Sequence, residues 1–363
     1  MGELKEIKQA IPALLQWYRQ TARPLPWRQN PTPYGVWVSE IMLQQTRIEA
    51  VIPYYHRFMA ELPTVAALAA VEDDRLMKLW EGLGYYSRAR NLKKAAETIM
   101  AHHGGELPAD HKALLALPGF GPYTAGAVAS IAFGIPAPAV DGNVMRVLAR
   151  LLADFEDVMR PATKRRYTEL LEAWISTDAP GDFNSALMEL GERVCLPNTT
   201  PKCEECPLYA VCKGREQGVA ALLPVRAAKK QRRVEERVML LLISSEDTPR
   251  VLLHRRPATG LLAGLWELPN LEGPYDFDKA CAAAESLGAT VLNSRSAGEG
   301  VHLFSHVEWR MTGVQITTPP FAPPAGYEWV TLEGLHEDYA LPTAFRPFAR
   351  LLPVLMERSV TDE

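Results

Sequence analysis

The chain has 363 residues, more than one hydrophobic core of ordinary size requires, so two domains are expected. With 47% hydrophobic and 23% charged residues, its composition is that of a globular protein rather than a disordered or fibrous one. Its charge gives no sign of a broad basic surface, because residues 1–226 carry 25 Lys and Arg against 25 Asp and Glu. Any binding to nucleic acid must therefore depend on local clusters and backbone amides.

The N-terminal residues Met1–Lys8 are charged and lack the apolar stretch of a signal peptide. No stretch approaches the roughly 18 apolar residues that a membrane-spanning helix needs. We therefore expect an intracellular protein, in the cytoplasm or nucleoid, with no membrane partner. In that compartment its five cysteines are expected to be reduced thiols or metal ligands.

Residues 1–215 are predicted to be almost wholly helical. One apolar stripe predicts a helix that begins near Gly35 and continues through Tyr55; its members are Val38, Ile41, Met42, Ile48, Ile52 and Tyr55. A second stripe, Val144–Leu152, follows Asp141, which suits the N-cap of that helix. From residue 216 to 233 the pattern dissolves into a Pro-containing and then basic stretch, which indicates a linker.

Residues 234–363 have a different character and predict an α+β domain. Val238–Ile243 and Val251–Leu253 are short apolar runs suited to buried strands. Val301–Val307 and Met311–Thr317 suggest a second hairpin, and residues 276–287 suggest one helix.

Four cysteines lie within eighteen residues, in the pattern Cys195-x7-Cys203-x2-Cys206-x5-Cys212. Four thiolates so close in sequence can surround one soft metal centre, which predicts zinc or an iron–sulfur cluster. The spacing alone does not decide between the two metals.

The stretch Leu114–Gly126 predicts a helix, a tight turn and a second helix that begins at once. Gly119 and Gly121 in the turn would let a phosphate approach the backbone, and the amides at the new helix N-terminus favour an anion. An ordinary helix–helix turn is the alternative interpretation. The neighbouring cysteine pattern favours a turn that grips the DNA backbone without reading sequence.

Together these features resemble the endonuclease III superfamily of DNA glycosylases, with helix-hairpin-helix and cluster loop. Asp141–Val144 belongs to the same superfamily resemblance, and within the superfamily the motifs Leu25–Arg28, Trp37–Thr46 and Gly82–Arg88 closely resemble those of MutY-type adenine glycosylases. The resemblance implies an all-α glycosylase domain over 1–215, with a six-helix part at about 30–137 and a cluster part from 1–29 and 138–215. It also implies one [4Fe-4S] cluster, held by the four cysteines.

The implied reaction is hydrolysis of the bond between adenine and deoxyribose, where adenine lies opposite 8-oxoguanine or guanine in double-stranded DNA. By resemblance Glu40 protonates adenine at N7 and then handles the attacking water. Asp141 stabilises the cationic sugar, by its charge alone or as a transient covalent partner, with support from Tyr123 and Asn143. Two carboxylates suit the cleavage of a glycosidic bond. Without the resemblance, Glu40 would be interpreted as a solvated first-turn glutamate.

In the lyase members of the superfamily a lysine occupies the position of Tyr123 and forms a Schiff base, which tyrosine cannot do. We therefore expect a monofunctional glycosylase. Separately, the protein is expected to be a monomer. The resemblance implies that Gln45 and Tyr85 wedge into the duplex while adenine is flipped out, and that Arg28 contacts the flipped base. The full set of implied DNA contacts is Arg28, Gln45, Thr46, Tyr85, Gly119, Gly121, Ser185, Phe304, Ser305 and His306.

The sequence departs from the family pattern at two points. Seven residues separate Cys195 from Cys203, where many relatives have six, but the extra residue falls in a loop that tolerates insertion. Ser185 stands where relatives often carry Glu or Gln near the adenine, which leaves that contact open.

Residues 234–363 resemble the Nudix-like domain of MutY proteins through Gly260–Pro269. The segment Lys279–Gly288 lacks the glutamate cluster that binds magnesium for hydrolysis, so this domain is expected to bind rather than cut. Phe304–His306 matches the family loop that touches 8-oxoguanine; judged by itself it is the end of a strand.

Three alternatives compete with an adenine glycosylase. A lyase acting on oxidised pyrimidines is disfavoured by Tyr123 and by the second domain. The others are a metal-stapled protein that binds DNA damage without catalysis, and a nucleotide hydrolase.

Overall fold

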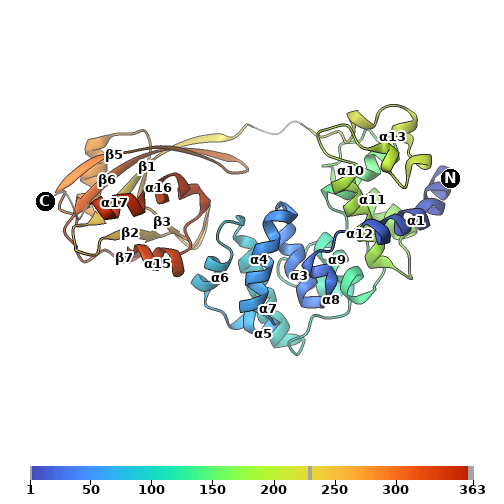
Figure 1. The fold of residues 1–363 in the computed structure, drawn as a ribbon, viewed down its shortest axis with the longest axis horizontal. Helices are drawn as coiled ribbons and strands as arrows, with labels where there is room; N and C mark the ends of the chain where they lie inside the picture. Colours follow the sequence, from blue (N-terminus) through green and yellow to red (C-terminus); the bar gives the residue numbers. More distant parts are fainter. Residues whose placement is uncertain (1, 228–230, 359–363) are drawn as a thin grey trace. The chain divides into compact units, whose positions relative to one another are not determined.

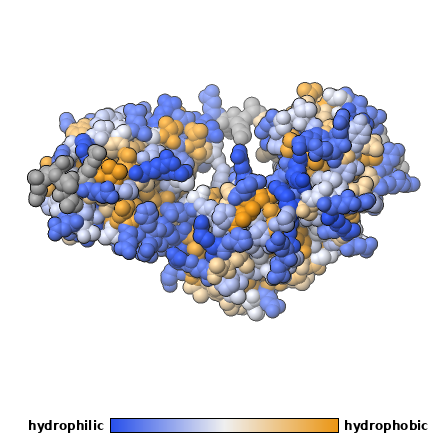
Figure 2. Space-filling model, in the orientation of Figure 1, coloured by the Kyte–Doolittle hydropathy of each residue, from blue (hydrophilic) through white to orange (hydrophobic). Residues whose placement is uncertain are grey.

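The computed structural model describes residues 2–227 and 231–358 and divides into two compact units. Met1–Ala70 and Arg90–Ala228 form the first unit, and Val71–Ala89 and Lys229–Glu363 form the second (Figure 1). Part of the expected linker, residues 228–230, lies outside the described residues. Among the residues described, no helix is long and apolar enough to cross a membrane. On the face drawn in Figure 2, hydrophilic residues surround scattered hydrophobic ones.

The first unit is helical, as the apolar periodicity of residues 1–215 predicts. Its helices are α1 (Gly2–Thr21), α2 (Pro26–Gln29), α3 (Pro33–Leu43), α4 (Ile48–Glu61), α5 (Val65–Ala70), α7 (Ser87–His102, which begins in the second unit), α8 (His111–Ala116), α9 (Pro122–Phe133), α10 (Gly142–Leu151), α11 (Pro161–Trp174), α12 (Pro180–Arg193), η1 (Cys203–Glu205), η2 (Tyr209–Val211), α13 (Lys213–Glu216) and η3 (Ala220–Leu222). Leu14, Leu148 and Phe183, from α1, α10 and α12, are buried in one core.

The expected single helix from Gly35 through Tyr55 is wrong. The chain forms α3 and α4 instead, separated by a turn at residues 44–47. Gln45 in this turn has a φ of 59°, the left-handed region that a helix cannot continue through. The apolar period runs across the turn, and no Gly or Pro marks it, so the sequence pattern gave no sign of the break.

The second unit contains one mixed sheet. Its elements are α6 (Asp73–Leu79), β1 (Arg233–Ser244), β2 (Arg250–Arg255), β3 (Trp266–Glu267), β4 (Asn270–Glu272), α14 (Phe277–Ser286), β5 (Asn293–Leu303), β6 (Val307–Thr318), β7 (Tyr327–Thr331), α15 (Leu332–Glu337), η4 (Thr343–Phe345), α16 (Arg346–Ala349) and α17 (Leu352–Arg358). The strand order is β3-β2-β1-β6-β5, with β4 on β1 and β7 on β2. Strands β1 and β6 run parallel, from Arg233 opposite Val307 to Ser244 opposite Thr318.

Both faces of the sheet are buried, which explains the continuous apolar run of β1. Met239, Leu241 and Ile243 face one cluster, which includes Phe345 and Phe348. The alternating residues Val238, Leu240 and Leu242 face the other cluster, which includes Ala280 and Ala284 of α14. A strand covered on both sides requires apolar residues at every position.

The expected second hairpin exists, but its turn lies elsewhere. The sequence predicted strands at 301–307 and 311–317, whereas β5 ends at Leu303 and β6 begins at Val307. Phe304–His306 therefore form the hairpin turn instead of a strand end. The pattern misled because alternating apolar residues continue across the turn on both sides, with no turn-forming residue between them except Ser305.

Candidate active site

Glu40 lies in the last turns of α3 and is buried, although it carries a carboxyl group. Thr32 is the N-cap of this helix, and its hydroxyl accepts a hydrogen bond from the Gly35 amide at 3.1 Å. Tyr123, in the first turn of α9, donates its hydroxyl to Glu40 Oε2 at 2.5 Å. The same hydroxyl lies 3.4 Å from the sulfur of Met188. Two helices thus fix the carboxyl group, in place of the solvated first-turn glutamate that periodicity alone suggested.

Burial raises the pKa of Glu40 to about 7. The Tyr123 hydrogen bond and the Arg28 charge act in the opposite direction, and the nearby Asp141 charge adds to the increase. Burial and the charge of Glu40 raise the pKa of Tyr123 well above its usual value, so the phenol stays protonated and donates its hydrogen. Near neutral pH the Glu40 carboxyl can therefore both release and accept a proton.

Asp141 caps the N-terminus of α10, as its sequence context predicted. Its Oδ1 accepts the Val144 amide at 2.7 Å, and its Oδ2 accepts the Asn143 side-chain amide at 2.8 Å. Arg146 in turn donates to Asn143 Oδ1 at 2.8 Å. Burial raises the pKa of Asp141, while these hydrogen bonds and the Arg146 charge favour its ionised form. The carboxylate is held in one orientation at a helix N-terminus, which favours negative charge.

One pocket brings together seven of the residues that the sequence singled out. They come from α2, α3, the turn after α3, α9, the N-terminus of α10 and α12, and they are Arg28, Glu40, Thr46, Tyr123, Asp141, Asn143 and Ser185. Gln45, Gly119 and Gly121 lie in the same unit but do not line this pocket. Tyr85 and Phe304–His306 belong to the second unit.

The sequence analysis missed Glu189, which also lines the pocket and whose side chain is fully buried. It accepts hydrogen bonds from Arg23 at 2.6 and 2.9 Å and from Arg28 at 3.0 Å. Burial by itself would raise the pKa of Glu189, but these two guanidinium groups hold it below its ordinary value. The spacing of Ser185, Met188, Glu189 and Glu192 on one face of α12 was the available signal.

Gln45 and Tyr85 share an unusual backbone conformation. Their φ angles are 59° and 45°, in the left-handed region that non-glycine residues rarely adopt. Gln45 is exposed, and the Tyr85 side chain is 48% exposed despite its aromatic ring. Strained backbone that presents a side chain to solvent is a frequent feature of binding sites.

The turn between α8 and α9 has the backbone that its glycines predicted. Gly119 has a φ of 76°, and a Cβ there would lie 2.7 Å from the Asn91 Cβ. Gly121 is the N-cap of α9, and open space surrounds the position where its Cβ would stand. The first amides of a twelve-residue helix are therefore accessible to an anion.

In the second unit, Ser305 and His306 are exposed at the β5–β6 turn. Two backbone hydrogen bonds hold the turn. The Phe304 amide donates to Val307 O at 2.8 Å, and the Arg233 amide donates to His306 O at 3.1 Å. The Phe304 ring packs edge-on against Trp309, at 4.9 Å between centroids.

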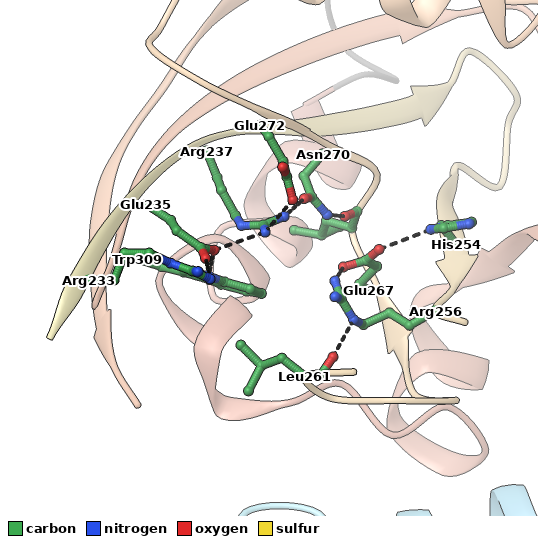
Figure 3. A network of polar contacts seen from close by, with 11 residues as sticks. Arg233, Glu235, Arg237, His254, Arg256, Leu261, Glu267, Asn270, Glu272 and Trp309 are labelled. Carbon is green, nitrogen blue, oxygen red and sulfur yellow. Dashed lines mark hydrogen bonds and ion pairs between the residues drawn. The ribbon is translucent and has the colours of Figure 1, made fainter. Parts of the chain in front are cut away.

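A polar network holds Trp309, the residue that the Phe304 ring contacts (Figure 3). The indole nitrogen donates to Glu235 Oε2 at 2.8 Å, and the Arg237 guanidinium lies over the ring at 4.3 Å. Arg237 also donates to Glu272 at 2.8 Å. Cation–π contacts and shared carboxylates of this kind restrict the ring to one position. The turn therefore stands on a rigid base while its tip remains open to solvent.

The four clustered cysteines line one small pocket beside Arg150. Arg150 donates to Cys195 Sγ at 3.3 Å and to Leu196 O at 2.9 Å, and Arg146 donates to Cys195 O at 2.8 Å. Within 2–227 and 231–358, no three His, Cys, Asp or Glu side chains are arranged to hold a single metal ion. Thiolates are soft ligands, which favour zinc or iron–sulfur centres over hard cations. The soft donor set and its pocket fit an iron–sulfur cluster.

Comparison with known proteins agrees with this geometry. Residues 38–175 match the HhH-GPD superfamily base excision DNA repair protein family, and residues 238–351 match the NUDIX domain family. The human adenine DNA glycosylase is 35% identical over 93% of this chain and 73% of its own length. The chain belongs to the adenine DNA glycosylases.

Other adenine DNA glycosylases give the same result. The protein of Schizosaccharomyces pombe is 34% identical over 83% of this chain and 80% of its own length. Among solved structures, a thermostable thymine-DNA glycosylase has a TM-score of 0.54 and is 30% identical, covering 59% of this chain and 98% of its own. A trapped endonuclease III–DNA covalent intermediate has a TM-score of 0.51 at 25% identity, covering 59% of this chain and 98% of that one.

These findings confirm the family, the enzyme class and both fold predictions made from sequence. This adenine DNA glycosylase removes adenine from DNA in base excision repair, with a helical catalytic region and a Nudix-like region. The roles of individual residues, the opposite base and the cluster remain predictions.

Proposed function

We propose that this enzyme removes adenine opposite 8-oxoguanine, with Glu40 as proton donor, Asp141 as the stabilising anion, and no lyase activity. The observation that carries the catalytic part is Glu40, a buried carboxyl whose pKa is raised to about 7 in the same pocket as a second, hydrogen-bonded carboxylate. Two carboxyl groups in one pocket, one buried and bonded to the Tyr123 phenol and the other capping a helix N-terminus, suit the acid and anion of glycosidic cleavage.

The proposed reaction proceeds in two steps. Glu40 gives its proton to N7 of adenine, the bond between C1′ and N9 breaks, and the bonding pair leaves with the base. Asp141 then faces the positive charge that remains on the sugar. Water adds to C1′ and passes a proton to the Glu40 carboxylate, which restores the acid and leaves an abasic site. Tyr123 orients Glu40 through its 2.5 Å hydrogen bond.

Tyr123 also supports a monofunctional enzyme. A lyase needs an amine that attacks C1′, and the phenol at this position is protonated and already donates to Glu40.

We assign recognition of the base opposite adenine to side chains outside the pocket. Gln45 and Tyr85, on strained backbone and exposed, suit insertion into the gap that a flipped adenine leaves. Ser305 suits contact with 8-oxoguanine because its hydroxyl is exposed on a rigid turn and can donate or accept. Phe304 and His306 flank it. Gly119 and Gly121 would bind the DNA backbone, and Arg28, Thr46 and Ser185 would surround the flipped adenine.

Cys195, Cys203, Cys206 and Cys212 would hold one [4Fe-4S] cluster, which when bound cross-links the loop after α12. The Arg146 guanidinium connects this loop with the site, since it bonds both Cys195 O and Asn143. Loss of the cluster would therefore disturb the residues that support Asp141.

The test is incubation of the full chain with duplexes that carry adenine opposite 8-oxoguanine, guanine or thymine, with release of free adenine as the readout. We expect fastest release opposite 8-oxoguanine, slower release opposite guanine and none opposite thymine. Borohydride added during turnover should trap no covalent adduct. Equal rates opposite 8-oxoguanine and guanine would refute the proposed opposite-base preference, and strong trapping would favour a lyase.

A further inference from the structure

The segment Val71–Ala89 belongs to the same compact unit as the C-terminal sheet, although helices of the other unit flank it in sequence. It consists of α6 and the turn that presents Tyr85. Nothing in the sequence pattern indicated this grouping, because it depends on contacts between residues more than 180 positions apart.

Lys78 makes the central contact of this segment, and its side chain is only 12% exposed. Its ammonium donates to Leu335 O at 3.0 Å and to Tyr339 O at 3.1 Å, and it bonds Glu81 at 2.7 Å. Leu335 lies within α15 and Tyr339 follows it, so the cation stands where helix carbonyls lack partners.

Glu81 completes the connection through its other oxygen. Its Oε1 accepts the Leu341 amide at 2.7 Å while Oε2 holds Lys78. Asp74 adds a two-point ion pair with Arg255, at 2.9 and 3.0 Å. Because both of those side chains are more than 40% exposed, that pair contributes less than the contacts of Lys78, whose side chain is largely buried.

At the far end of the segment, the Tyr85 hydroxyl lies 3.2 Å from Ser305 Oγ. Arg88 holds the turn by donating to Leu83 O at 3.0 Å and Gly84 O at 3.1 Å, and its guanidinium lies 5.7 Å from the centre of the Tyr85 ring. The strained turn is therefore fixed in the same unit as the hairpin.

We propose that Val71–Ala89 and the Phe304–His306 turn form one recognition head for the base opposite adenine. Lys78 and Glu81 are its positioning residues, which set Tyr85 and Ser305 at the separation that one lesion requires. This inference rests on the proposed preference for 8-oxoguanine. It assigns part of that preference to residues that touch neither the DNA nor the reacting atoms.

The test compares Lys78→Met and Glu81→Ala with the wild type in the full chain, with Lys112→Met, an exposed lysine of α8, as the matched control. Single-turnover adenine release is measured opposite 8-oxoguanine and opposite guanine at one salt concentration. Since hydrogen bonds of this kind contribute about 0.5–1.5 kcal/mol, each variant should lower the 8-oxoguanine preference about 2- to 10-fold. Release opposite guanine should stay within about twofold of wild type, because the catalytic pocket is intact.

Hydrogen exchange supplies a second readout, since the Leu341 amide should exchange faster in Glu81→Ala than in the control. A wild type without preference would refute the proposed function. If the wild type shows the preference and Lys78→Met keeps it in full, the recognition head is overturned and the proposed function stands. The same conclusion follows if Lys78→Met slows adenine release equally on both substrates. Should these variants not fold, Asp74→Arg and Arg255→Asp provide the test. Each should lower the preference and their combination restore it, and no restoration would overturn the inference.

Discussion

The catalytic pocket and the Phe304–His306 turn both face DNA in the proposed function, yet they are built in opposite ways. Glu40 is 6% exposed and held by Tyr123, while Ser305 and His306 are exposed on a turn above a rigid base. Burial gives a carboxyl the pKa that proton transfer needs, and it does so before substrate binds. Recognition of a base in a duplex instead requires a polar group that remains accessible.

The difference predicts how each region responds to substitution. Changes in the pocket should reduce the rate on every substrate, whereas changes at the turn should alter the choice between substrates.

The largest effect is expected from Glu40→Gln. It keeps the size of the side chain but removes the acid, which should slow adenine release by about 10²- to 10⁴-fold. Duplex affinity should be largely retained. Glu49→Gln, an exposed glutamate of α4, is the control and should release adenine at the wild-type rate. Near wild-type turnover by Glu40→Gln would show that Glu40 is not the proton donor.

Asp141→Asn should have a similarly large effect, because it removes the anion while preserving the cap to Val144. Loss of charge at the developing cation costs roughly 10²–10³-fold or more in comparable electrostatic sites. Thermal unfolding separates this from misfolding: the melting temperature should change little while adenine release nearly stops. An active Asp141→Asn enzyme would mean that another group stabilises the sugar.

Cys203→Ser should give protein that loses its brown colour and binds fewer than the roughly four iron atoms per chain expected of the wild type. Cys281→Ser is the control, since this fifth cysteine is on α14 and does not line the pocket of four. Metal analysis and visible absorbance measure both. Wild-type protein that is colourless, active and contains one zinc would refute the cluster, and an unaffected Cys203→Ser would imply another ligand.

Tyr123→Phe should slow adenine release about tenfold, within the range for a hydrogen bond to a charged group. The Tyr123 hydrogen bond lowers the pKa of Glu40, so its removal raises that pKa. Because the protonated carboxyl is the active form, the decline in rate toward high pH should move to higher pH. A decline at the same pH as in the wild type would show that the pH profile does not report the ionisation of Glu40.

The smallest effect is expected at the turn. Phe304→Ala with Ser305→Ala should lower the preference for 8-oxoguanine over guanine by at least about fivefold, the lower range for a base contact. The rate opposite guanine should remain close to wild type. Ser296→Ala, exposed on β5, is the control. An unchanged preference at the same salt concentration would show that this turn does not recognise 8-oxoguanine.

The sequence predicted what depends on local pattern. Asp141 as an N-cap, the buried strand Val238–Ile243 and the glycine turn before α9 follow from spacing over a few residues. The pattern did not show the turn at Gln45, where tertiary packing imposes a strained backbone on a segment with good helical periodicity. Such local conflicts concentrate at functional sites.

Contacts between distant residues were also beyond a sequence pattern. Glu189 meets Arg23 and Arg28 across more than 160 residues, and α6 joins the C-terminal sheet through Lys78. The raised pKa of Glu40 was equally invisible, because burial of a glutamate beside an apolar stripe depends on which helices cover it. The resemblance singled out Glu40 as a candidate, whereas its burial and raised pKa required the structure.

The pH dependence of single-turnover adenine release reports the protonation state of Glu40 during the chemical step. If protonated Glu40 is the proton donor, the rate is high in mild acid and falls as the pH rises through about 7. The residual rate of Glu40→Gln should lack that transition. A wild-type rate that is flat through neutral pH, or a transition that persists in Glu40→Gln, would show that Glu40 is not the proton donor.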